Sequence, residues 1–71
     1  MNILFTSPGC AKCQLAKGIL DDLNIEYVIS QDAHEAERYD ISSVPALVMN
    51  GEVLHLPAII AMSAKGGASH V

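Results

Sequence analysis

The chain has 71 residues, of which 51% are hydrophobic, and a formal net charge of -4 at pH 7. This length fits one domain around a single small core, and the apolar content excludes a disordered chain. Its four Lys and Arg residues are scattered, which excludes an electrostatic nucleic-acid surface, and no apolar run is long enough to cross a membrane, so we expect a cytoplasmic protein with neither kind of partner.

The first part of the chain predicts a strand, a helix and a second strand. Residues 2–6, NILFT, contain three consecutive apolar side chains, as a strand buried on both faces does, so this strand should lie centrally in a sheet. After a break at residues 7–9, apolar residues recur at helical spacing over residues 11–23. The β-branched and aromatic run IEYVI, residues 25–29, predicts the second strand. This order indicates a right-handed parallel unit.

The middle of the chain predicts a short helix and a hairpin. Residues 32–40 begin with an Asp and a Glu at capping-box spacing, which favours a helix start. Two strands follow, at residues 46–49 and 52–55. They flank Asn50 and Gly51, the pair that best tolerates the positive φ angles of a type I′ turn.

A last helix begins near Pro57, a residue well suited to the first helical turn. We expect this helix to be short and to end before Gly66 and Gly67, because glycine commonly follows a helix end. The sequence therefore predicts one domain over residues 1–65, with the element order βαβαββα, and a flexible tail over residues 66–71.

The only two cysteines, Cys10 and Cys13, stand where the first helix begins. Unpaired N–H groups and the positive end of the helix dipole favour an anion there, such as a thiolate, and Lys12 adds nearby positive charge. Cys13 lies one helical turn further on and points toward the body of the domain, within reach of Cys10. This spacing suits a reversible dithiol couple in which Cys10 attacks a disulfide and Cys13 resolves the mixed disulfide.

Other interpretations of the cysteines stay open. A zinc site needs four ligands, and the chain has neither a second cysteine pair nor histidines at ligand spacing. We therefore expect no metal site within one chain. Two chains together would supply four cysteines, so a metal ion or an iron–sulfur cluster that bridges two chains stays an alternative. The cysteines can also be inert buried residues, or part of an interaction domain without redox activity.

A proline far from the cysteines in sequence is the second feature of interest. Pro45 stands at the entrance of a predicted strand that must pair with the first strand. A proline in this position can hold a cis peptide bond where the fold requires one.

With FTSPGCAKC near its start and SVPALVMNGEV after a strand and a helix, the chain resembles the thioredoxin fold in its smallest forms, the glutaredoxins and the small redox-active disulfide proteins. The resemblance covers about residues 2–55. It implies an α/β fold with a central four-stranded mixed sheet and a short C-terminal helix. It also implies a thiol–disulfide oxidoreductase, a glutaredoxin-like electron carrier that reduces protein or small-molecule disulfides.

The resemblance also implies the roles of individual residues. Cys10 matches the exposed nucleophile of these families and Cys13 the resolving cysteine. Pro45 matches their cis-proline, and the backbone of Val44 matches the position that hydrogen-bonds a bound disulfide or glutathione chain. An extended substrate would pair there like a short strand.

The implied partners are a disulfide substrate and a reductant, either glutathione or an enzyme of the thioredoxin-reductase type. No cofactor is required, and glutathione is an optional co-substrate. The chain has Ala11 and Lys12 where glutaredoxins usually have proline and tyrosine, and VLHLPAII where they have a Gly-Gly turn and acidic residues that bind glutathione. Lys12 can still attract a glutathione carboxylate. Because the short last helix leaves the core less covered, we expect a monomer or a weak dimer.

Overall fold

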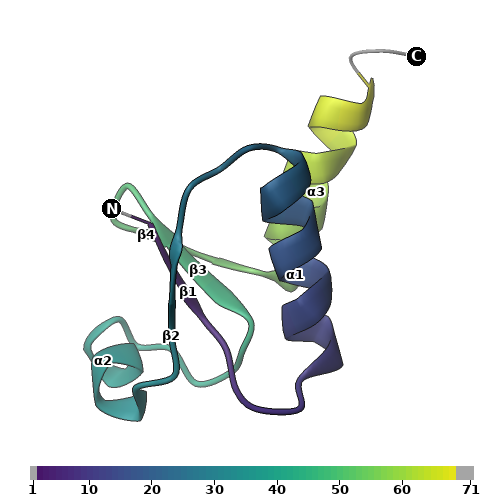
Figure 1. Ribbon diagram of the computed structural model, residues 1–71. Coiled ribbons are helices and arrows are strands. Elements are labelled where there is room, and N and C mark those ends of the chain that lie inside the picture. Colours follow the sequence, from purple (N-terminus) through teal and green to yellow (C-terminus); the bar gives the residue numbers. More distant parts are fainter. Residues whose placement is uncertain (1, 69–71) are drawn as a thin grey trace.

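The computed structural model describes residues 2–68, with side chains described up to residue 63 (Figure 1). Seven elements follow one another in the predicted order βαβαββα, and the α/β fold class is confirmed. The elements are β1 (Ile3–Phe5), α1 (Ala11–Asp22), β2 (Val28–Ser30), α2 (Ala33–Arg38), β3 (Ala46–Met49), β4 (Glu52–His55) and α3 (Leu56–Ala68).

The four strands form one mixed sheet with the order β2-β1-β3-β4. Strand β1 is parallel to β2 and antiparallel to β3, so its predicted central position is confirmed. The β3–β4 hairpin turns at Asn50 and Gly51, whose φ angles are 53° and 80°. Both angles are positive, as a type I′ turn requires, and the predicted hairpin is confirmed.

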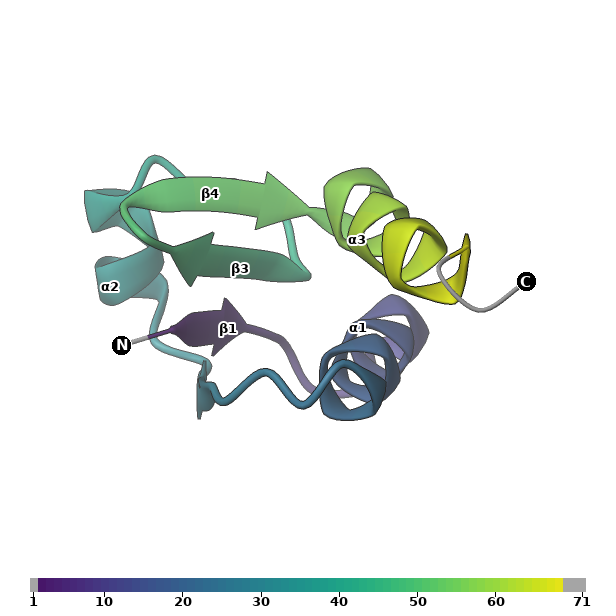
Figure 2. The same ribbon diagram turned by 90° about the horizontal axis from the view of Figure 1, so that it is seen from above.

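Helices cover both faces of the sheet. Figure 1 and Figure 2 show α1 and α3 side by side on one face, and α2 on the other. The core is therefore divided into two clusters. The cluster beneath α1 and α3 contains Leu4, Ala16, Leu20, Leu47 and Ile59. The cluster on the face of α2 contains Phe5, Ile41, Ala46 and Val48.

The position of β1 between two covered faces of the sheet explains why its sequence is apolar throughout. Leu4 belongs to the cluster beneath α1 and α3, whereas Phe5 belongs to the cluster on the opposite face. Since successive side chains of a strand point to opposite faces, a strand covered on both sides needs apolar residues throughout. Leu4 and Phe5 are 0% and 1% exposed.

The second strand begins later than predicted, because Ile25 closes helix α1 instead of starting β2. Asn24 has a φ of 58°, and its N–H donates to the carbonyl of Asp21 at 3.1 Å. The N–H of Ile25 donates to the carbonyl of Leu20 at 3.0 Å. These two bonds are those of a Schellman cap, and Ile25 packs against the cluster that contains Leu20. The predicted strand over residues 25–29 is therefore wrong at its start.

Helix α2 begins at the predicted N-cap, Asp32, and the hydroxyl of Ser30 links Glu35 to the backbone N–H of this cap residue. The carboxylate of Asp32 accepts the N–H of His34 at 2.9 Å. Ser30 connects the strand to the helix, because its hydroxyl donates to Glu35 at 3.0 Å and accepts the N–H of Asp32 at 3.2 Å. In the predicted capping box Glu35 would reach the N–H of Asp32 directly, and here the serine hydroxyl stands between them.

Helix α3 continues through Gly66 and Gly67 to Ala68, so its predicted end before Gly66 is wrong. Glycine costs about 1 kcal/mol in a helix interior, which weakens a helix without stopping it. The domain boundary at residue 65 and the flexible tail stay predictions, and residues 69–71 lie outside the described part of the chain. No described helix is both long and apolar enough to cross a membrane.

Candidate active site

The two cysteines lie at the junction between β1 and α1. Gly9, with a φ of 72°, turns the chain after the strand. Cys10 follows in an extended conformation and is the N-cap of α1. Its Sγ accepts the N–H of Cys13 at 3.1 Å. The sulfur of Cys10 thus occupies the position of a helix-capping oxygen, where the free N–H groups of the first turn also favour a thiolate.

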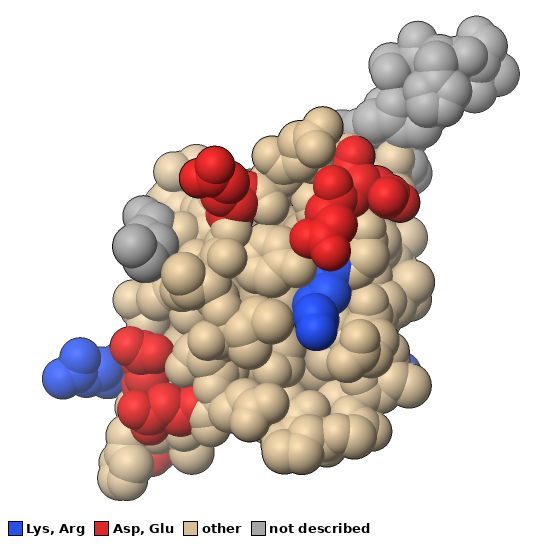
Figure 3. Space-filling model, in the orientation of Figure 1, with Lys and Arg blue, Asp and Glu red and all other residues tan. Residues whose placement is uncertain are grey.

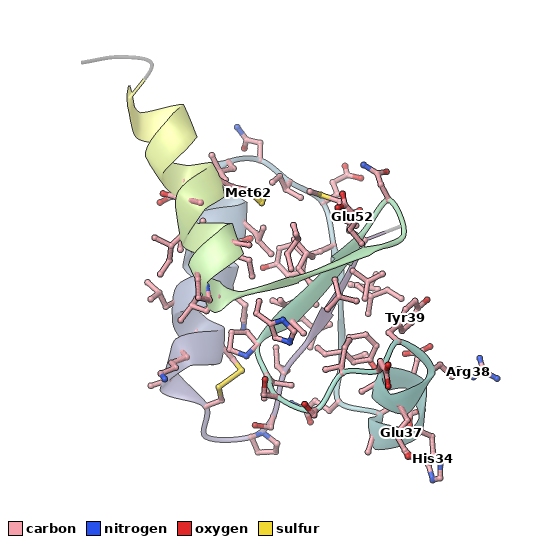
Figure 4. The ribbon with its side chains drawn as sticks, turned by 180° about the vertical axis from the view of Figure 1, so that it is seen from behind. His34, Glu37, Arg38, Tyr39, Glu52 and Met62 are labelled. Atoms are coloured by element: carbon pink, nitrogen blue, oxygen red, sulfur yellow. A yellow bond between two sulfur atoms is a disulfide. The ribbon has the colours of Figure 1, made fainter. Side chains whose placement is uncertain are left out.

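Cys10 and Cys13 are joined by a disulfide, which Figure 4 shows at the beginning of α1. Their Cα atoms are 5.2 Å apart. Cys13 is 2% exposed and faces the core, whereas Cys10 is only partly buried. An external thiol or disulfide can therefore reach the sulfur of Cys10 far more easily than that of Cys13.

The segment around Pro45 enters β3 at the end of the sheet where the chain leaves β1 toward the cysteines. The Val44–Pro45 peptide bond is cis. Phe5 pairs with Ala46 in the antiparallel ladder, so continuing this register by one residue places Pro45 next to Thr6. Pro45 is buried and Val44 is half-buried. The segment that enters β3 through Val44 and Pro45 and the loop that leaves β1 toward Cys10 therefore lie at the same end of the sheet.

Lys12 is the remaining predicted site residue, and it is exposed in the first turn of α1. The labelled charged residues of Figure 4 lie elsewhere: Glu37 and Arg38 are on α2, and Glu52 is at the hairpin, away from the disulfide. Among the described residues, no three His, Cys, Asp or Glu side chains gather as a metal site would need.

The sequence did not predict a hollow of about 340 Å³ that adjoins Val44. It lies between the end of β1, helix α2 and the segment before Pro45. Apolar side chains, hydroxyl groups and carboxylates line it, among them Phe5, Ile41, Ser42, Ser43, Asp32 and Glu37. Its lining comes from three separate segments of the chain, so no single stretch of the sequence indicated it.

The chain is similar to known proteins along most of its length. It matches the model of the thioredoxin domain family over residues 1–58. It is 34% identical over 59 residues to a thioredoxin of Methanocaldococcus jannaschii, a match that spans 70% of this chain and 69% of that protein. The crystal structure of the thioredoxin-like protein BC3987 matches with a TM-score of 0.69 and 31% identity, over 78% of this chain and 85% of that chain. A point mutant of BC3987 matches with a TM-score of 0.68 and 29% identity, over 78% and 84%.

Proposed function

This chain belongs to the thioredoxin domain family and is a thiol–disulfide oxidoreductase, and on that basis we propose that Cys10 is its attacking thiol and Cys13 its resolving thiol. The observation that carries this assignment is the difference between the two sulfurs. Cys10 is partly exposed at the start of α1 and accepts a backbone N–H, whereas Cys13 is buried against the core. A nucleophile needs both access and a stabilised thiolate, which only Cys10 combines.

The proposed reaction transfers two electrons. The Cys10 thiolate attacks one sulfur of the substrate disulfide, forms a mixed disulfide and releases the other substrate sulfur as a thiolate. The Cys13 thiolate then attacks the Cys10 sulfur and releases the second substrate thiolate, and solvent protons neutralise the products. The Cys10–Cys13 disulfide of the structure is the oxidised product of this cycle. Glutathione or an enzyme of the thioredoxin-reductase type would supply two electrons to restore the dithiol.

The substrate is proposed to bind beside Val44. An extended chain can pair with the backbone of this residue in the manner of an added strand. The hollow beyond Val44 has an apolar floor that includes Phe5 and Ile41, and its charged lining residues are the carboxylates Asp32 and Glu37. Glutathione carries two carboxylates of its own, so these charges favour protein disulfides over bound glutathione. Lys12 is the proposed contact for a glutathione carboxylate, so its positive charge favours the binding of glutathione instead.

A trapping experiment tests the assignment. Reduced Cys13→Ser protein is incubated with an oxidised protein substrate and analysed by intact mass under denaturing conditions. We expect a stable adduct through Cys10, because the second step is blocked, and no adduct with Cys10→Ser. Equal trapping by both variants, or by neither, would contradict the assignment.

The unsubstituted protein, with both cysteines present, distinguishes the alternative, a metal or iron–sulfur module at a dimer interface. Its zinc and iron contents are measured together with disulfide turnover, using dithiothreitol as the reductant. We expect turnover in the metal-free protein. Stoichiometric metal without turnover would support the alternative instead.

A further inference from the structure

Strand β2 forms an open edge of the sheet. It pairs with β1 on one side, and no strand among residues 2–68 pairs with its other side. Val28 and Ile29 are 46% and 47% exposed, although both are large and apolar. Proteins usually protect such edges with lysine, proline or a bulge, and the sequence Val28–Ser30 contains neither residue. The edge is therefore free to accept another strand.

The backbone of β2 is oriented so that another strand can pair with its open side. Its inward groups are already bonded: the N–H of Val28 donates to the carbonyl of Asn2 at 2.9 Å, and the carbonyl of Ser30 accepts the N–H of Thr6 at 3.0 Å. In a parallel ladder, alternate residues of a strand bond to opposite sides. The N–H and C=O groups of Ile29 consequently point away from β1, toward the open side.

The same edge adjoins a shallow hollow between β2 and the end of α1. Ile25, Val28 and Ile29 supply its apolar lining, and its two charged lining residues, Asp21 and Glu26, are both acidic. Figure 3, which views the molecule with β2 in front, shows two acidic groups at the upper end of this side, one of them with a basic group beneath it, and a third acidic group at the lower left with a basic group beside it. The hollow thus offers apolar surface next to negative charge.

The carboxylate of Asp21 is held in place at this hollow. The hydroxyl of Tyr27 donates to Asp21 Oδ1 at 2.9 Å. Burial and the neighbouring carboxylate raise the pKa of Tyr27 above its ordinary value of 10.0. This hydrogen bond fixes the position of the Asp21 side chain at the hollow, next to the exposed apolar residues of β2.

We propose that the β2 edge binds an extended segment of a partner protein that carries a basic side chain, and that this segment adds to the sheet beside β2. Its backbone would bond to Ile29. The stem of a Lys or Arg would lie on the exposed apolar side chains while its charged end meets Asp21 and Glu26.

A second copy of this chain fits the edge less well. Pairing of two β2 edges about a two-fold axis would bring the acidic hollows of both copies, each with Asp21 and Glu26, to one junction. Each chain also has a net charge of -4. Like charges in this arrangement repel, whereas a basic segment neutralises them.

The proposed docking edge is separate from the proposed substrate site beside Val44. In the sheet β2 lies on one side of β1, whereas β3, which follows Pro45, lies on the other. A segment bound to β2 would therefore leave the backbone of Val44 open to a substrate. The proposal does not rest on the roles of the cysteines.

Titration of the ¹⁵N-labelled full chain with synthetic peptides tests the proposal. The probe is an acetylated and amidated peptide of alternating Thr and Val with one central Lys, and its matched control has Glu in place of Lys. We expect amide shift changes centred on residues 27–31 and about tenfold tighter binding of the Lys peptide, since exposed ion pairs contribute modestly. Equal affinities, shift changes elsewhere or no binding would overturn the proposal.

Two variants locate the contact. Ile29→Pro removes the outward N–H without touching the inward ladder, and its matched control Ile29→Thr keeps both the N–H and a β-branched side chain. We expect only Ile29→Pro to abolish binding. Glu26→Lys provides an independent check should the proline variant not fold, because it should reverse the preference between the Lys and Glu peptides. Unchanged preference in Glu26→Lys would count against the proposal.

Two further measurements test whether a second copy of the chain occupies the edge and whether the edge is independent of the redox activity. Sedimentation at increasing protein concentration would reveal a dimer, and a dimer abolished by Ile29→Pro would show that the occupant is a second copy, which overturns the proposed partner. Reduction of a disulfide with dithiothreitol as the electron source should proceed unchanged in Ile29→Pro and Glu26→Lys. Failure of the trapping experiment would leave these binding results untouched.

Discussion

At the scale of single residues, the two sulfurs of one disulfide differ in what surrounds them. Cys10 ends a turn and caps a helix, so its sulfur faces backbone N–H groups and, on one side, solvent. Cys13 lies inside the helix on its buried face. We therefore expect these two residues of the same type, separated by a single helical turn, to differ in reactivity because of their positions.

This inequality predicts selective alkylation. When the reduced protein is treated briefly with iodoacetamide at pH 7, we expect Cys10 to react at least about tenfold faster than Cys13, because Cys13 is 2% exposed. Peptide mass analysis measures the two sites separately. The single-cysteine variants Cys10→Ser and Cys13→Ser serve as controls, and comparable rates in the two variants would refute the prediction.

Tyr27 predicts a pH dependence of stability. Burial, its hydrogen bond to Asp21 and the charge of that carboxylate raise its pKa above 10.0 in the folded protein. The folded pKa is therefore higher than the unfolded one, so the stabilisation is fully present below about pH 10 and is lost as pH rises through the folded pKa. Urea unfolding between pH 8 and 11 should show a decline that is smaller in Tyr27→Phe.

An ultraviolet titration checks the pKa itself. The chain has two tyrosines and no tryptophan, so in Tyr39→Phe the phenolate absorbance comes from Tyr27 alone. We expect the folded protein to titrate later than the same variant in urea. A midpoint at or below that of the unfolded chain would contradict the direction of the shift.

At the scale of elements, α1 and α2 end in the same way. Each has a non-glycine residue in the left-handed region after its last turn, Asn24 in α1 and Asp40 in α2, with φ of 58° and 63°. An isoleucine follows in both cases and returns to the core. For α2, Ile41 donates its N–H to Ala36 at 3.0 Å and is 8% exposed. The apolar residue after each cap therefore fixes where its helix ends.

The left-handed residue at the end of α2 predicts a stabilising substitution. Asp40→Gly should raise the free energy of unfolding by about 0.5 to 1 kcal/mol, because glycine adopts a positive φ without strain. Part of any gain could come from removing a negative charge at a helix C-terminus. Asp40→Asn removes only the charge, and the difference between the two variants in urea unfolding isolates the backbone contribution. If the glycine variant is no more stable than the asparagine variant, the predicted backbone contribution is absent and the prediction is wrong.

The elements also show which features can be predicted from sequence. The hairpin was predicted with its boundaries, because Asn50 and Gly51 specify their turn locally. The start of β2 was not, because Ile25 has a β-branched side chain suited to a strand and yet serves to close a helix. Local propensity cannot distinguish these two uses, and packing against the cluster that contains Leu20 decides between them.

In the candidate site, too, features specified by a short stretch of sequence can be predicted, and features assembled from distant segments cannot. The Cys10–Cys13 pair and Pro45 are recognisable because spacing and position along the chain identify them. The hollow beside Val44 is not recognisable, since it is assembled from the end of β1, from α2 and from the segment before the proline. None of these segments has a pattern that announces a binding surface.

At the scale of the whole molecule, the two faces of the sheet are covered unequally. Helices α1 and α3 enclose one cluster. On the other face α2 has six residues, and none of these described residues is fully buried. Tyr39 is 38% exposed even though its ring lies 6.0 Å from that of Phe5. The cluster beneath α1 and α3 should therefore contribute most of the stability.

This asymmetry predicts the effect of core truncation. Leu20→Ala should lower the free energy of unfolding by about 2 to 5 kcal/mol, a large part of the total for a domain of this size. Leu20 is 0% exposed in that cluster. Val53→Ala, on the face of α2, should cost less, and Ile60→Ala, at a position 44% exposed on α3, should cost least. Urea unfolding of the three variants measures the order, and a reversed order would refute it.

Because α2 contributes no fully buried side chain, its outward residues are free to diverge without endangering the fold. Yet Asp32, which caps this helix, and Glu37, which lies on its surface, line the hollow that adjoins Val44. Glu37→Lys would therefore change the charge that an incoming substrate meets while leaving the cysteines and the main core untouched. Helix α2 thus carries charge beside the proposed substrate site that can be altered separately from the two cysteines.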